Sequence, residues 1–239
     1  MDYDAKLISR ETLAGDVAIF RFEKPEGFQF VAGQYCLLTV PDAGFHDEHG
    51  LRRAFSLASS PLEKDLLIVT KLSGSAFKKT LAEMTPGTTV TLGQAMGSLV
   101  LPQATTTSLA FLAGGIGITP FRSMCRFAVD AKTGHNISLF YSSRAPGETP
   151  FLDELQRMGE EHGQVGVFIT MTRAPEDPKV WSGLRGRLSP DTIKERCPAW
   201  ESALYYIAGP PAMADAMKQS LDAMKIPADR IRVELFTGY

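Results

Sequence analysis

The sequence predicts two domains, an antiparallel β-barrel over residues 1–104 and a doubly wound α/β domain with a five-stranded parallel sheet over residues 105–239. Two observations carry this prediction. Up to about residue 100, short β-rich runs are broken by glycine and proline, which is typical of a small barrel. From Leu109 onward, apolar strand patterns alternate with helix patterns, which is typical of a parallel sheet covered by helices on both faces. A threonine-rich linker at residues 102–108 separates the two halves.

The composition is that of a globular protein, with 44% hydrophobic and 22% charged residues among 239. The net charge of −2 argues against a nucleic-acid partner, and no apolar run is long enough to span a membrane. Cys36, Cys125 and Cys197 are scattered and odd in number, which favours a reducing, cytoplasmic compartment. They also exclude a four-cysteine iron–sulfur cluster within the chain, so a one-electron carrier would be a separate molecule.

In the first half, the β-rich runs are broken by a single helix pattern at 75–84, and a polar loop interrupts them. The expected strands are 17–22, 34–40, 66–70 and 88–92, with a further strand in the stretch 52–61, and residues 97–102 close this half. The loop at 44–50 contains His46 and His49 but has no cysteine or third histidine nearby. We therefore expect a solvated loop and no metal site.

A cation, an aromatic ring and a hydroxyl follow one another along the run Arg53-Ala54-Phe55-Ser56. Arg53 and Phe55 are two positions apart and share one face of a strand, whereas Ser56 points to the other side. This arrangement suits a planar ligand that carries a phosphate, although a half-exposed strand with a surface arginine is the alternative. Gly74 and Ser75 open the helix pattern and suggest a second anion site, with an ordinary capped helix as the alternative.

In the second half, the expected strands are 109–113, 137–142, 165–171, 203–208 and 230–235, and the expected helices are 119–131, 150–162, 189–196 and 211–225. The first strand runs into Gly114-Gly115-Ile116-Gly117-Ile118-Thr119-Pro120. Its glycines would let a ligand approach the amino end of a helix capped by Thr119 and begun by Pro120, a position that favours phosphate. A tight turn that only packs a helix on the sheet is the alternative.

The other strand ends carry hydroxyls and arginines in place of a carboxylate. Ser143 and Arg144 follow the second strand, Arg173 follows the third, and Arg187 comes later. An NAD-binding domain more often places an acidic residue there for the ribose hydroxyl. The pattern therefore favours a 2′-phosphate, and hence NADPH over NADH, unless these arginines are simply solvated.

Five motifs in order resemble the ferredoxin–NADP⁺ reductase superfamily over essentially the whole chain. They are Arg53-Ala54-Phe55-Ser56, Gly74-Ser75-Ala76-Phe77, Gly114 to Pro120, Gly209-Pro210-Pro211-Ala212-Met213, and Glu234-Leu235-Phe236-Thr237-Gly238-Tyr239. The resemblance implies a six-stranded flavin-binding barrel followed by a five-stranded NADP-binding domain. It also implies FAD, with FMN less favoured, as the flavin.

The resemblance implies site residues by position. The flavin set comprises Arg53, Ala54, Phe55, Ser56, Val69, Lys71, Gly74, Ser75, Ala76 and Phe77. The nucleotide set comprises Gly115, Gly117, Thr119, Pro120, Ser143, Arg144, Arg173, Arg187, Gly209, Pro210 and Met213. Ser56, Glu234 and Tyr239 are the expected catalytic residues. The resemblance implies Ser56 near the reactive flavin nitrogen and Tyr239 or Phe236 over the other flavin face, and Glu234 would either relay a proton or help to orient the nicotinamide.

Two residues depart from the family pattern. Phe55 replaces a tyrosine, which removes one hydroxyl contact and keeps the stacking. Ala208 replaces a cysteine that often precedes the Gly-Pro turn and lies near the path of the hydride, so hydride transfer is expected to be less efficient than in the family pattern.

The function implied is transfer of a hydride from NADPH to bound FAD, followed by release of electrons to ferredoxin or flavodoxin. The alternatives are reduction of a small acceptor, such as free flavin, a ferric chelate or a quinone, and service as the reductase subunit of an oxygenase. A non-enzymatic regulatory subunit that binds flavin or nucleotide also stays open. A monomer is expected by default.

Overall fold

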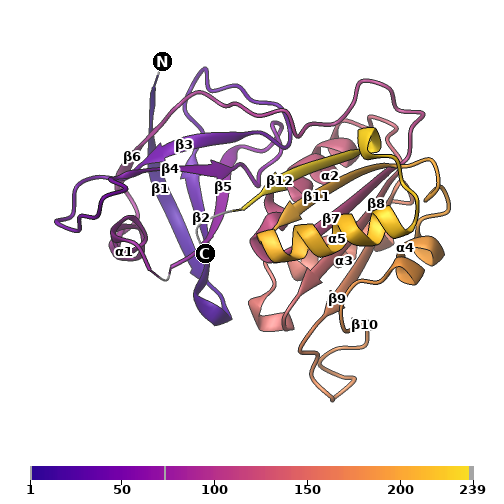
Figure 1. Ribbon diagram of the computed structural model, residues 1–239. Coiled ribbons are helices and arrows are strands. Elements are labelled where there is room, and N and C mark those ends of the chain that lie inside the picture. Colours follow the sequence, from indigo (N-terminus) through magenta and orange to yellow (C-terminus); the bar gives the residue numbers. More distant parts are fainter. Residues whose placement is uncertain (1, 73, 237–239) are drawn as a thin grey trace.

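The computed structural model describes residues 2–72 and 74–236 of the chain. Two domains lie side by side, the first drawn in indigo to purple and the second in magenta to yellow (Figure 1). The end of the last strand, β12, reaches the junction between them (Figure 1). Of the helices described, none is long and apolar enough to cross a membrane.

The first domain is a six-stranded antiparallel sheet in the order β4-β3-β6-β1-β2-β5, which confirms the predicted barrel class. Its elements are β1 (Tyr3–Thr12), η1 (Ala14–Asp16), β2 (Val17–Glu23), β3 (Tyr35–Thr39), β4 (Arg52–Ser56), β5 (Asp65–Lys71), α1 (Ala76–Glu83) and β6 (Thr89–Leu92). Strand β1 was not predicted. Only Ala5 and Leu7 are buried along its ten residues, so its apolar pattern is too short to read.

The strands at the two edges of this sheet, β4 and β5, face each other without pairing. Each has one partner, β3 for β4 and β2 for β5, and no backbone hydrogen bond joins β4 to β5 within the described ranges. Beyond β4, the Ala58 amide donates to the Leu67 carbonyl of β5, and this hydrogen bond joins the two edges at one end. The open stretch between the edges leaves main-chain groups of both strands for a ligand.

The second domain is a six-stranded parallel sheet in the order β10-β9-β8-β7-β11-β12. Its elements are β7 (Leu109–Gly114), η2 (Gly115–Gly117), α2 (Ile118–Asp130), β8 (Ile137–Ser143), η3 (Pro146–Glu148), α3 (Leu152–Glu161), β9 (Val165–Met171), β10 (Leu184–Arg185), α4 (Pro190–Arg196), β11 (Leu204–Gly209), α5 (Pro211–Ala223), η4 (Ala228–Arg230) and β12 (Ile231–Leu235). The five predicted strands are all present, and the two-residue β10 adds a sixth at the edge. The chain reverses direction across the sheet between β7 and β11, where doubly wound folds bind their ligands.

Helices cover both faces of this sheet because residues along each strand alternate between two cores. Leu109 and Phe111 of β7 pack in one core with α2 and α3. Ala110 and Leu112 pack in the other with α4 and α5. The second domain is therefore a three-layer α/β structure, as predicted.

Helix α2 begins differently from the prediction. A 3-10 turn, η2, follows the strand, so the helix starts at Ile118 and Gly117 takes the N-cap position. Thr119 is buried and does not cap the helix; its hydroxyl donates to the Ile116 carbonyl at 3.0 Å. Pro120 is the third helical residue, where the missing N–H still sacrifices no helical hydrogen bond.

Helix α2 also joins the two domains through a buried arginine. The Arg122 guanidinium lies 2.8 Å from the Glu63 carboxylate of the barrel and 2.8 Å from that of Glu154 on α3, and it donates to the Ala58 carbonyl at 2.8 Å. The next residue, Ser123, donates its hydroxyl to the Ser59 carbonyl at 2.6 Å. These contacts tie the glycine turn at the start of α2 to the first domain.

Candidate functional site

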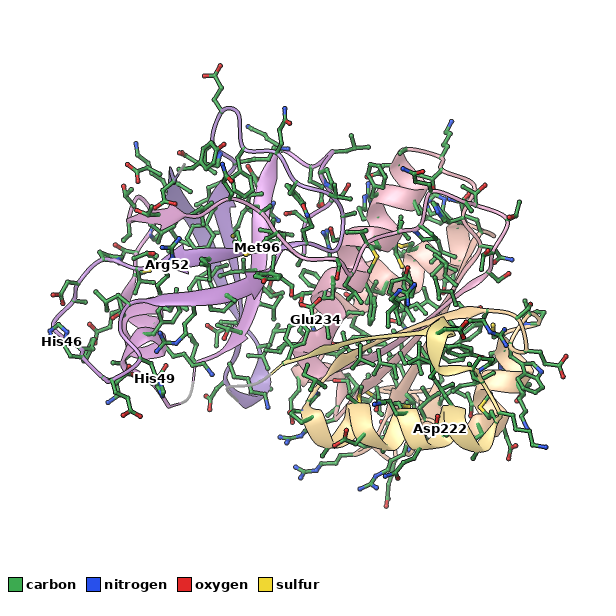
Figure 2. The ribbon with its side chains drawn as sticks, turned by 45° about the horizontal axis from the view of Figure 1, so that its top comes forward. His46, His49, Arg52, Met96, Asp222 and Glu234 are labelled. Atoms are coloured by element: carbon green, nitrogen blue, oxygen red, sulfur yellow. The ribbon has the colours of Figure 1, made fainter. Side chains whose placement is uncertain are left out.

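A serine and a glutamate from different domains meet at the junction. Ser56 ends β4 and Glu234 lies on β12, and the Ser56 hydroxyl donates to Glu234 Oε1 at 3.1 Å. Figure 2 shows Glu234 between the two domains. Burial raises the pKa of Glu234 above its ordinary value, and the hydrogen bond from Ser56 offsets this only in part. The pair is thus a buried hydroxyl beside a carboxyl group that can exchange a proton nearer neutral pH.

The amino end of α1 forms a positively charged cradle next to β4. Ser75 caps the helix and accepts from the Lys78 amide at 3.4 Å. The Arg53 guanidinium lies over the Phe77 ring, 5.3 Å from its centroid. Burial lowers the pKa of Lys78, and the nearby charges of Lys71 and Arg53 lower it further, so three cations share this region. Such a helix end with clustered cations suits a phosphate.

The fit to a flavin follows from the open stretch between β4 and β5 together with this cradle. Residues 53–56 lie on the free edge of β4 and Val69 to Lys71 on that of β5. Phe55 stacks on Phe77 with ring centroids 5.6 Å apart, on the same side of β4 as Arg53. The arrangement offers a ring surface, main-chain donors and acceptors, and a phosphate cradle close to one another, so the residues present fit a phosphorylated flavin. Phe77 itself is fully buried, which leaves only its backbone for a ligand.

A cavity of about 680 Å³ opens at the carboxyl ends of the parallel strands. Of the predicted nucleotide residues, it is lined by Gly115, Ser143, Arg144, Arg173, Arg187, Pro210 and Met213, and Lys71 of the barrel also borders it. Gly115 has a φ of +53° and no atom within 4 Å of the position of a Cβ, so its turn faces open space. The cavity therefore joins the glycine turn, the three arginines and the barrel edge.

Four predicted nucleotide residues do not line this cavity: Gly117, Thr119, Pro120 and Gly209. A Cβ on Gly117 would lie 2.3 Å from the Ala208 carbonyl oxygen, so this glycine serves the close packing of α2 against β11. Likewise, a Cβ on Gly209 would lie 2.9 Å from Met213 Cε. These residues shape the wall behind the cavity.

A second cavity of about 480 Å³ lies at the domain junction beside the Ser56–Glu234 pair. Its lining comprises Tyr35, Ala54, Ser56, Gly97, Ser98, Leu99, Arg232, Val233, Glu234, Leu235 and Phe236. Phe236 is half-buried and packs against the core beside α2, and its amide donates to the Gly209 carbonyl at 3.1 Å. Tyr239, expected over the flavin, lies outside the described residues.

The departure at Ala208 lies on the strand next to Glu234, behind the site, and lines neither cavity. Ala208 is fully buried on β11 and pairs in register with Glu234 of β12. Alanine lacks the thiol of the family's cysteine, and the polar side chains that meet beside it are those of Ser56 and Glu234.

Sequence reasoning missed two charged groups that the fold brings to the site. The Asp47 carboxylate accepts from the Ala76 amide at 2.8 Å and lies 3.4 Å from Arg53, on the phosphate cradle itself. Arg122 sits at the junction of the domains. Asp47 and Arg122 meet partners 29 and 59 residues away, and no local pattern signals such contacts.

The two loop histidines are exposed and lie near acidic neighbours, His46 by Asp42 and His49 by Glu48, each at 3.6 Å. No group of three or more His, Cys, Asp or Glu suited to a metal ion occurs in the described part of the chain.

Family models match both domains. The oxidoreductase FAD-binding domain matches residues 4–100, and the oxidoreductase NAD-binding domain matches residues 111–219. Ferredoxin–NADP reductase B of Sorangium cellulosum (strain So ce56) is 29% identical over 77% of this chain and 74% of its own length. The reductase component of propane 2-monooxygenase from Rhodococcus jostii (strain RHA1) is 26% identical over 99% of this chain, which spans 64% of that relative's length.

Solved structures agree with these matches. A ferredoxin NADP⁺ reductase from Neisseria gonorrhoeae with bound FAD and NADP superposes with a TM-score of 0.78 at 26% identity, over 98% of both chains. The cytochrome P450 reductase GcoB of Amycolatopsis shares the fold, with a TM-score of 0.83 at 24% identity over 100% of this chain and 70% of its own. The chain therefore belongs to the ferredoxin–NADP⁺ reductase superfamily, with an FAD-binding domain followed by an NAD-binding domain.

Proposed function

We propose that this chain takes a hydride from NADPH onto FAD and passes the electrons to a separate acceptor. The observation that carries the proposal is the Ser56–Glu234 pair, which lies where the barrel and the nucleotide domain meet. Bound FAD would supply the redox chemistry by accepting a hydride and releasing electrons singly. The protein's contribution is placement and electrostatics.

Each part of the site has a defined task in this proposal. Arg53 and the amide groups at the start of α1 hold the flavin phosphate, and Phe55 lies against the ring. The Ser56 hydroxyl positions the reactive edge, and Glu234 holds or releases a proton there, since burial brings its pKa closer to neutrality. A carboxy-terminal aromatic, Tyr239 or Phe236, covers the other face until nicotinamide replaces it.

We propose NADPH as the preferred donor because three arginines border the nucleotide cavity against one carboxylate, that of Glu148, which lies 4.0 Å from Arg144. Arg144, Arg173 and Arg187 are all exposed and face a cavity that also contains Ser143. A guanidinium pairs with a 2′-phosphate in two parallel hydrogen bonds, which a ribose hydroxyl cannot match. NADH would then bind more weakly.

For the acceptor, we propose a separate electron carrier such as ferredoxin or flavodoxin. The named relatives include a ferredoxin–NADP reductase and the reductase component of a monooxygenase. A second candidate, reduction of a small planar acceptor, is favoured by the 480 Å³ cavity that opens beside Ser56 and Glu234. Its walls combine apolar and hydroxyl groups, which is typical of sites for small organic molecules.

We also propose that the chain acts as a monomer in the cytoplasm, with the domain boundary between residues 104 and 105. One chain supplies the flavin cradle, the nucleotide cavity and the Ser56–Glu234 pair. The three cysteines are free and buried, which is typical of a reducing compartment.

Turnover with artificial and protein acceptors tests this function. The FAD-loaded chain is expected to reduce ferricyanide with NADPH, and a chain that binds FAD without any turnover would be a regulatory subunit. Cytochrome c reduction is then measured with and without added ferredoxin. A rate that rises only with ferredoxin supports a carrier-dependent reductase, and equal rates would favour the small-acceptor function.

A further inference from the structure

The proposed flavin-phosphate cradle holds a carboxylate of the chain itself. Asp47 Oδ2 accepts from the Ala76 amide at 2.8 Å, and Ala76 is the first residue of α1, where an N–H group has no acceptor within the helix. Asp47 Oδ1 lies 3.4 Å from Arg53 Nη2. The hydrogen bond from Ala76 lowers the pKa of Asp47, so the group is an anion at neutral pH. The Asp47 carboxylate thus contacts two of the groups that would bind the phosphate, the Ala76 amide and the Arg53 guanidinium.

The loop that carries Asp47 keeps it close to the cradle. Within the loop, Asp47 Oδ1 accepts from the His49 amide at 3.0 Å, and the Gly50 amide donates to the Asp47 carbonyl at 3.2 Å. Arg53 donates to the carbonyls of His49 and Gly50 at 2.5 and 3.0 Å. Figure 2 shows the loop, marked by His46 and His49, on the side of the barrel away from the second domain. Rotation of the Asp47 side chain would free the Ala76 amide and break the hydrogen bond from the His49 amide. The hydrogen bonds from Arg53 to the carbonyls of His49 and Gly50, and from the Gly50 amide to the Asp47 carbonyl, do not involve this carboxylate.

We propose that Asp47 is a specificity-determining residue for the flavin: it occupies the phosphate subsite of the flavin-free chain, and from the rim of that subsite it disfavours ligands with more negative charge. The inference rests on the proposed function, because it requires that a flavin phosphate enter this cradle. FAD brings one negative charge on the phosphate in the subsite and a second on the adjoining phosphate of its pyrophosphate, farther from Asp47. The terminal phosphate of FMN brings both of its charges into the subsite above its second pKa of about 6, and riboflavin brings none. Asp47 therefore favours FAD over FMN.

The size of the effect follows from Coulomb's law. At the dielectric constant of water, about 80, a carboxylate displaced to about 5 Å from the phosphate weakens the binding of each unit of negative charge roughly fourfold. This is a lower bound, because the Asp47 side chain is 25% exposed. Asp47→Asn removes this repulsion and keeps the shape of the side chain and its acceptor for the His49 amide. The variant is expected to bind FAD at least about fourfold and FMN at least about fifteenfold more tightly, with riboflavin affinity unchanged.

The test is isothermal titration calorimetry of the flavin-free full chain with riboflavin, FMN and FAD at about pH 8, where the FMN phosphate is doubly charged. Asp42→Asn is the matched control. Asp42 lies two residues before the loop at 44–50 and is also an aspartate, but its carboxylate accepts from the Gly44 amide and lies 3.6 Å from His46. The control is expected to leave all three affinities unchanged, and a low-salt series should enlarge the gain in Asp47→Asn.

The outcomes separate this inference from the proposed function. Gains that rise from riboflavin to FAD to FMN in Asp47→Asn alone support the inference. Equal gains for all three ligands, the same gains in Asp42→Asn, or weaker FAD binding in Asp47→Asn would overturn it while leaving the flavin site intact. A wild-type chain that binds none of the three flavins would overturn the proposed function, and the inference with it.

Discussion

Replacing Ser56 by alanine removes one hydroxyl oxygen from the junction and leaves the backbone of β4 unchanged. The oxygen is 3.1 Å from Glu234 Oε1, and Ser56 is only 6% exposed, so water does not replace the lost donor freely. A hydrogen bond to a charged group contributes about 1.5–3 kcal/mol. If most of this acts on the geometry of hydride transfer, flavin reduction slows by about 10- to 100-fold.

The assay is anaerobic stopped-flow mixing of the FAD-loaded chain with NADPH, followed by loss of the visible flavin absorbance. Calorimetry with FAD checks that affinity stays within about threefold, since Arg53 and α1 hold the other end of the cofactor. Ser98→Ala is the control, because Ser98 lines the junction cavity and takes no part in the pair. Its rate should match the wild type.

Loss of the Ser56 hydrogen bond also removes an interaction that lowers the pKa of Glu234. The pH profile of flavin reduction in Ser56→Ala should therefore shift to higher pH. An unchanged rate, or a slower rate fully explained by weaker FAD binding, would refute the role assigned to Ser56.

Three further predictions concern stability and selectivity. Arg122→Met removes the cation between two glutamates whose side chains are 24% and 25% exposed. Because of this partial exposure, we expect the free energy of unfolding to fall by about 3 kcal/mol, the lower end of the range for a broken buried ion pair. Chemical denaturation measures this change, and a fall below about 1 kcal/mol would contradict the prediction. Glu234→Gln should be more stable than the wild type at neutral pH. Burial raises the pKa of Glu234 in the folded chain above its ordinary value of 4.5, so the folded state favours the protonated carboxyl, and the wild type loses this stability as the pH rises through the folded-state pKa whereas the neutral amide does not. Melting temperatures should converge as the pH falls towards 4.5, and a difference independent of pH would be inconsistent with this reasoning. Arg187→Ala should raise the KM for NADPH about tenfold without changing that for NADH, whereas Arg185→Ala, outside the cavity lining, should change neither; equal effects on both nucleotides would show that Arg187 does not read the 2′-phosphate.

Strands of the second domain were predictable because buried parallel strands are continuous apolar runs bounded by polar turns. The run predicted at 165–171 coincides with β9, and that at 137–142 ends one residue short of β8. Strand β10 was not predictable, since two residues carry no periodicity. The start of α2 was misplaced at Thr119 because a 3-10 turn continues from the glycines directly into the helix.

The site was only partly predictable for a different reason. Motifs that follow strands, such as the turn at Gly115 and the arginine at 173, reach the cavity because parallel strands end at one edge. Asp47 and Arg122 depend on contacts between distant segments, which the order of residues does not reveal. Their neighbours in sequence look like an exposed loop and an ordinary amphipathic helix.

The proposed function is tested most directly by the anaerobic absorption spectrum of the FAD-loaded chain before and after addition of NADPH, and separately of NADH. We expect NADPH to bleach the visible flavin band quickly and NADH to do so more slowly, since three arginines border the nucleotide cavity. Equal bleaching by both nucleotides would contradict the role of the arginines. A flavin band that neither nucleotide changes would contradict hydride transfer at the Ser56–Glu234 junction.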